Sequence, residues 1–195
     1  MLGWIQHHFR GMPIVYILRH PCAVAASFVR EGWEGQLQGM LAQGSLADDH
    51  LSDEQLDAIF KADTLFERAI AIWCIETTVA LRQLRLGSHV VCYEHLLSKP
   101  KSTLRELWTF LGRDPTDIGG AMKQLRRPST TSRNGQANDW RTQLSPLQLQ
   151  RAAAILKAFN LDQLYSVDSP MPNTRIPLQP WLPVEPKVMR LGESQ

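Results

Sequence analysis

Two segments far apart in the chain carry residue types that bind anions. In the first, Arg19 follows the apolar run Pro13 to Leu18, which is typical of a buried strand in a parallel sheet. Pro21 suits the first turn of a following helix, on which Ser27 lies. Ligands of open α/β sheets bind at the carboxyl ends of the strands, and an Arg guanidinium beside a hydroxyl suits a phosphate. The alternative is a solvent-exposed Arg and an ordinary helical Ser.

The second segment, residues 126–139, is polar and rich in hydroxyl groups, so it cannot be core. It contains Arg133, Asn134 and Gly135. A loop with Gly lets backbone N–H groups approach an anion closely, and Arg133 adds positive charge. We expect Trp140 to anchor the end of this loop in the core. The alternative is a plain surface loop rich in Ser, Thr and Asn.

Both segments resemble the 3′-phosphate-binding segments of the PAPS-dependent sulfotransferases. In that family a strand ends in Arg and a Ser follows eight positions later, which is the spacing of Arg19 and Ser27. The later segment, Arg-Lys-Gly-x-x-Gly-Asp-Trp-Lys, closes over the same phosphate. The residues that match it in type and spacing are Arg133, Gly135, Asp139 and Trp140, with Arg141 in place of the Lys. Asn134 and Asn138 depart from it, replacing a Lys and a Gly.

The middle of the chain is similar to the same family. Tyr93-Glu94-His95-Leu96, then Pro100, then Phe110-Leu111-Gly112 resembles its Tyr-Glu-Asp-Leu, Pro and Phe-Leu-Gly stretch, with His95 where Asp is usual. The resemblance implies that Tyr93 contacts the adenine of the nucleotide. The alternative is a Tyr at a strand end that packs on the sheet.

The resemblance implies a nucleotide site and an activity. Adenine would contact Tyr93, and the 3′-phosphate would contact Arg19, Ser27, Arg133, Asn134 and Gly135. The co-substrate would be PAPS, without a metal, and its sulfuryl group would pass to an unknown hydroxyl or amine of a small-molecule or sugar acceptor. The other hypothesis is a non-catalytic remnant of the fold that binds a nucleotide or a protein.

Part of the family pattern is missing. The family has a P-loop-like fold whose 5′-phosphosulfate loop and catalytic base lie well before the Arg, yet only eighteen residues precede Arg19 and none resembles that loop. His7 and His8 are too close to Arg19 to be the base, so the catalytic residues are unknown. We expect an N-terminally truncated domain at 1–168 that self-associates through an exposed sheet edge and shows no detectable transfer by itself.

Composition excludes several classes of protein. The chain has 195 residues and a net charge of +2, too small to indicate nucleic acid or a membrane surface as partner. The longest largely apolar stretch, Ala69 to Leu81, contains Glu76 and is shorter than a bilayer span, and no signal peptide is evident. The three cysteines lack metal-ligand spacing, which favours reduced, buried thiols in a cytoplasmic protein.

The pattern of apolar residues predicts an α/β fold, a partial P-loop-like three-layer domain with a short parallel sheet flanked by helices. A second buried strand, 88–93, follows a long helix at 66–84, which makes a right-handed crossover unit. Further helices are expected near 4–9, 23–30, 52–60, 100–111, 114–125 and 146–159, and a loop within the segment 32–47, which shows no clear period. Ser52 with Gln55 and Ser145 with Gln148 predict capping boxes at two of these helix starts. Residues 169–195 hold six of the twelve prolines, and we expect an extended tail there.

Overall fold

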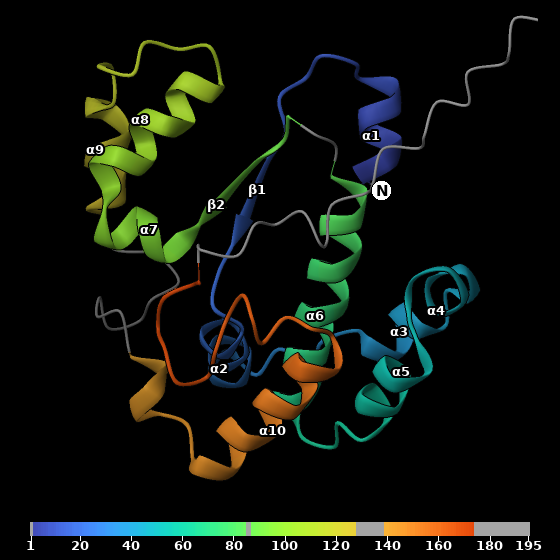
Figure 1. The fold of residues 1–195 in the computed structure, drawn as a ribbon. Coiled ribbons are helices and arrows are strands. Elements are labelled where there is room, and N and C mark those ends of the chain that lie inside the picture. Colours follow the sequence, from blue (N-terminus) through green and yellow to red (C-terminus); the bar gives the residue numbers. More distant parts are fainter. Residues whose placement is uncertain (1, 85–86, 128–138, 174–195) are drawn as a thin grey trace, which may run out of the picture.

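The computed structural model describes residues 2–84, 87–127 and 139–173, and most of them are helical (Figure 1). The sheet consists of β1 (Val15–Leu18) and β2 (His89–Cys92), which pair in parallel. Val15 lies opposite His89, and Leu18 lies opposite Cys92. The predicted parallel crossover between the two strands is therefore confirmed, and the fold belongs to the general α/β class.

Two helices pack together beside one face of the sheet. Helix α2 (Pro21–Glu31) begins with Pro21 at its first position and ends at Gly32, whose φ of 66° suits glycine. Helix α6 (Leu65–Gln83) begins with a capping box between Thr64 and Glu67 and is buried over most of its length. The strand residues that join this core are Tyr16, Leu18 and Val90.

The other face of the sheet meets a second group of helices. These are α7 (Tyr93–Ser98), α8 (Pro100–Phe110) and α9 (Gly119–Leu125), which lie together on the far side of β2 in Figure 1. The His89 ring stacks on Phe110 of α8, with 5.0 Å between the ring centroids. Since neighbouring strand residues point to opposite faces, helices contact this short sheet from both sides.

The remaining helices are α1 (Leu2–His8), α3 (Leu37–Leu41), α4 (Gly44–His50), α5 (Asp53–Phe60) and α10 (Pro146–Ala158), with the short 3-10 helix η1 (Trp140–Thr142). Helices α1, α3, α5 and α10 contact α6, α4 contacts α3, and η1 contacts α2. Helix α10 packs against α5 and α6. The predicted capping boxes are present at the starts of α5, between Ser52 and Gln55, and of α10, between Ser145 and Gln148.

Two expectations about the elements were wrong, and a third was incomplete. The segment 32–47 contains the expected loop, at 32–36, but it also contains α3 and most of α4, two helices too short to show a clear apolar period. Tyr93 begins α7 instead of ending the strand. Asp114 caps a turn by accepting from the Thr116 N–H at 2.8 Å and hydroxyl at 2.7 Å, and the helix predicted from there begins only at Gly119.

Strand β1 lies at the edge of the described sheet and carries an exposed apolar side chain. Among the described residues β1 pairs only with β2, and Ile17 is 58% exposed. The predicted tail, 169–195, lies largely outside the described residues. Where it is described, the Asn173 N–H donates to the Leu164 carbonyl at 2.9 Å. In the described ranges, no helix combines the length and apolarity needed to cross a membrane.

Candidate functional site

Arg19 and Tyr93 lie together at the carboxyl ends of the two strands. Each follows the last paired residue of its strand, Leu18 in β1 and Cys92 in β2. The Arg19 guanidinium carbon lies 5.0 Å from the centre of the Tyr93 ring, within the range of a cation–π contact. The two residues predicted to hold the phosphate and the base of one nucleotide are therefore neighbours.

The charge of Arg19 is available to a ligand. The side chain is exposed, and in the described ranges no carboxylate pairs with it. An exposed cation–π contact contributes only about 0.5–1 kcal/mol, less than a charge-assisted hydrogen bond to an anion. A phosphate can therefore bind the Arg19 guanidinium either in its contact with the Tyr93 ring or after the guanidinium has left that ring.

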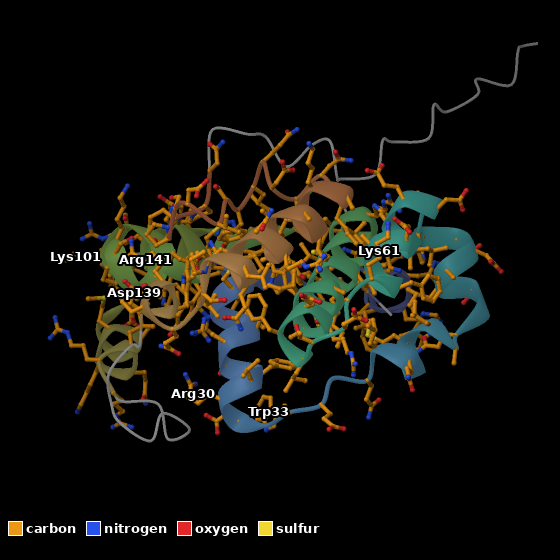
Figure 2. All side chains as sticks on the ribbon, turned by 90° about the horizontal axis from the view of Figure 1, so that it is seen from below. Arg30, Trp33, Lys61, Lys101, Asp139 and Arg141 are labelled. Carbon is orange, nitrogen blue, oxygen red and sulfur yellow. The ribbon has the colours of Figure 1, made fainter. Side chains whose placement is uncertain are left out.

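Ser27 is the third predicted residue in the described part of the chain. Its hydroxyl oxygen accepts from the Arg30 guanidinium at 3.0 Å, and Arg30 also contacts Glu31 at 3.1 Å. Figure 2 shows Arg30 near Trp33, at the end of α2. Because the Ser27 oxygen accepts this bond, its own proton remains to be donated to an anion. In the described part of the chain, the hydrogen bond of the Ser27 side chain is made to Arg30 and not to Arg19.

Glu94 connects the two strand ends. Its Oε1 accepts from the His20 backbone N–H at 2.7 Å, and its Oε2 accepts from the Tyr165 hydroxyl at 2.8 Å. His20 follows Arg19, and Glu94 follows Tyr93. This carboxylate therefore ties together the two segments that carry the candidate ligand-binding side chains.

His20 is a structural residue. Its side chain is buried, and Nδ1 accepts from the Cys22 backbone N–H at 3.2 Å, which caps α2. A backbone N–H only donates, so the ring proton lies on Nε2, which donates to the Ser166 carbonyl at 3.1 Å. Burial lowers the pKa of His20, and the Ser166 carbonyl and Glu94 oppose this shift. With both ring nitrogens bonded, His20 is not placed to act as a catalytic base.

Aromatic and thiol groups enclose this network. The His20 ring stacks on Trp140 at 4.3 Å and meets the edge of Tyr165 at 5.2 Å, measured between ring centroids. Burial, followed by the nearby Cys92 and Glu94, raises the pKa of Tyr165. Burial also raises the pKa of the Cys92 thiol. Tyr165 and Cys92 are therefore neutral, and Glu94 accepts from the Tyr165 hydroxyl and the His20 N–H.

The second predicted segment is described only at its end. Trp140 is 6% exposed and belongs to the core cluster, which confirms its predicted anchoring role. Asp139 caps η1 and accepts from Arg141 Nε at 2.8 Å, a bond that lowers the pKa of Asp139. Figure 2 shows Asp139 and Arg141 together, to one side of α2. The predicted ligands Arg133, Asn134 and Gly135 lie outside the described residues.

A cavity of about 160 Å³ lies next to these strand ends. Its apolar wall includes Leu18 and Leu164, and its polar lining includes His95, Thr103 and Glu106. Leu18 directly precedes Arg19, and His95 lies two residues after Tyr93. The cavity therefore offers space for a small ring or a polar group beside the candidate site.

Sequence reasoning missed Glu94 and Tyr165 as parts of the site. An acidic residue directly after Tyr93, at a strand's carboxyl end, was the available signal for Glu94. No sequence signal pointed to Tyr165, because it lies 71 positions after Glu94 and contacts it only in the folded chain. The described residues contain no group of three or more His, Cys, Asp or Glu side chains arranged to hold a metal ion. Comparison of the chain with models of protein families, with curated proteins and with solved structures found no match.

Proposed function

We propose that this chain binds a 3′-phosphorylated adenine nucleotide at the ends of β1 and β2. One observation carries the proposal: an available guanidinium and an aromatic ring, Arg19 and Tyr93, lie 5.0 Å apart at the carboxyl ends of paired parallel strands. Such an edge is where α/β folds place their ligands. The guanidinium suits the phosphate, and the ring suits the face or edge of the base.

The activity proposed with this site is that of the sulfotransferases: transfer of a sulfuryl group from PAPS to a hydroxyl or amine of a small molecule or sugar. A P-loop-like three-layer domain at 1–168 is part of the same proposal. Sulfuryl transfer depends mainly on positioning and on stabilising the charge of the leaving phosphate. The support is the resemblance of the segments around Arg19, Tyr93 and Arg133 together with the meeting of the first two.

A non-catalytic nucleotide-binding protein is the second candidate. The observation that favours it is His20, the residue next to Arg19, whose ring is buried with both nitrogens bonded. The histidine closest in sequence to the phosphate-binding Arg is therefore not placed to deprotonate an acceptor.

Calorimetry with two nucleotides tests the site. Adenosine 3′,5′-bisphosphate should bind at least tenfold more tightly than 5′-AMP, because a charge-assisted contact contributes about 1.5–3 kcal/mol. Arg19→Ala should remove most of this preference and leave the affinity for 5′-AMP nearly unchanged. Arg105→Ala, which removes an exposed Arg from α8, is the matched control. Equal affinities of the wild type for the two nucleotides would refute the proposal.

A transfer assay separates the two candidates. Radiolabelled PAPS is incubated with a panel of phenols, alcohols, amines and sugars. Transfer above the level without protein, abolished by Arg19→Ala, identifies an enzyme. Nucleotide binding without transfer identifies the non-catalytic protein.

A further inference from the structure

The Glu94 carboxylate has one donor on each oxygen. The His20 backbone N–H donates to Oε1 at 2.7 Å, and the Tyr165 hydroxyl donates to Oε2 at 2.8 Å. Glu94 lies in the first turn of α7, and its two partners come from the junction of β1 with α2 and from the segment after α10. One side chain therefore joins three parts of the chain that are distant in sequence.

This connection lies where the sheet no longer holds the two strands together. The strand pairing ends at Leu18 and Cys92, and the chain then enters α2 on one side and α7 on the other. Beyond the last strand pair, the bond from His20 to Glu94 is the next described hydrogen bond between these two segments. Hydrogen bonds to an ionised carboxylate are shorter and stronger than those between neutral groups.

We infer that Glu94 is a positioning residue that holds Arg19 and Tyr93 at the separation needed to bind one nucleotide, and that Tyr165 orients it. The inference rests on the proposed nucleotide site. Each ligand-binding side chain is the chain neighbour of one end of the bond: Arg19 precedes His20, and Tyr93 precedes Glu94. A change in the bond therefore moves both backbones relative to each other.

A measurement without nucleotide tests the positioning itself. In the NMR spectrum, the Arg19 side-chain protons should be shifted upfield by the Tyr93 ring current, because the guanidinium lies 5.0 Å from the ring centre. Tyr93→Leu supplies the chemical shift of the unstacked side chain. Glu94→Ala should move the Arg19 signals most of the way to that value, and Glu54→Ala, an exposed change on α5, should not.

Nucleotide binding then tests the functional consequence. Glu94→Ala should weaken binding of adenosine 3′,5′-bisphosphate by about tenfold through lost preorganisation, and it should reduce the preference over 5′-AMP. Glu94→Gln, which keeps one acceptor oxygen, should restore part of both. Tyr165→Phe removes only the hydroxyl donor and should have a smaller effect of the same kind. These two variants replace Glu94→Ala if that protein does not fold.

The outcomes distinguish the two proposals. If the wild type does not prefer the bisphosphate, the proposed function fails, and the Arg19 signals still test the positioning. If the Arg19 signals and the nucleotide preference of the folded Glu94 variants match those of the wild type, the inference is overturned. It is also overturned if the signals move and the preference does not change.

Discussion

Acidification should destabilise this protein through His20. Nδ1 accepts from the Cys22 N–H, and a proton placed on that nitrogen would face another donor and remove the cap of α2. Burial lowers the pKa of His20 below its ordinary value of 6.5, although Glu94 beside it favours the charged form. The unfolded chain therefore binds a proton at a higher pH than the folded chain does.

This difference in proton binding sets the direction and size of the change in the free energy of unfolding with pH. The stabilisation is complete above the unfolded pKa of about 6.5 and declines as the pH falls from there toward the folded pKa. One group changes the free energy of unfolding by at most about 1.4 kcal/mol per pH unit. Because the unfolded histidine is only half protonated at pH 6.5, the loss between pH 6.5 and 5.5 is at most about 1 kcal/mol. The midpoint of thermal unfolding should therefore fall by up to about 2–4 °C for a chain of this size.

The assay is thermal or urea unfolding at half-unit steps from pH 7.5 to 5. His20→Gln cannot titrate, and its amide can still accept and donate, so its curve should lack this decline. His7→Gln, a change of an exposed histidine on α1, should keep it. If the wild type and His20→Gln show the same slope below pH 6.5, the reasoning from burial and from the Cys22 bond is wrong.

Two further predictions concern the edge of the sheet and the core. We expect the chain to self-associate through the outer edge of β1, and Ile17→Lys should reduce this in sedimentation experiments, because a lysine on an edge strand opposes pairing with another chain. Leu147→Lys, at a 63% exposed site on α10, is the control, and a monomeric wild type would contradict the prediction. Trp140→Ala should lower the free energy of urea unfolding by about 3–5 kcal/mol, since the buried ring stacks on His20. Trp33→Ala, at a 56% exposed site, should cost much less, and equal losses would refute the assignment of Trp140 as an anchor.

Local signals in the sequence predicted much of the fold. The apolar runs before Arg19 and Tyr93 predicted both strands, and the capping boxes at Ser52 and Ser145 predicted the starts of α5 and α10. These signals act between residues a few positions apart, so they can be read without the tertiary structure. The short helices α3 and α4 and the late start of α9 lacked such signals.

The sequence also predicted where the candidate site lies. The carboxyl ends of parallel strands meet at one edge, so the positions of Arg19 and Tyr93 after two buried strands were enough to place them there. It did not predict that the Ser27 hydroxyl would already accept from Arg30. Their spacing places these two residues on neighbouring turns of a helix, but whether their side chains form a hydrogen bond depends on the rotamers that they adopt.

The order of the apolar runs and helices along the chain was enough to predict the two strands, their parallel crossover and the types of residue at their ends. Which polar groups meet beneath those ends depends on tertiary packing. Glu94 binds His20 across 74 positions and Tyr165 across 71 positions. No local pattern encodes such contacts, since they exist only after β1, α7 and the segment after α10 have packed together.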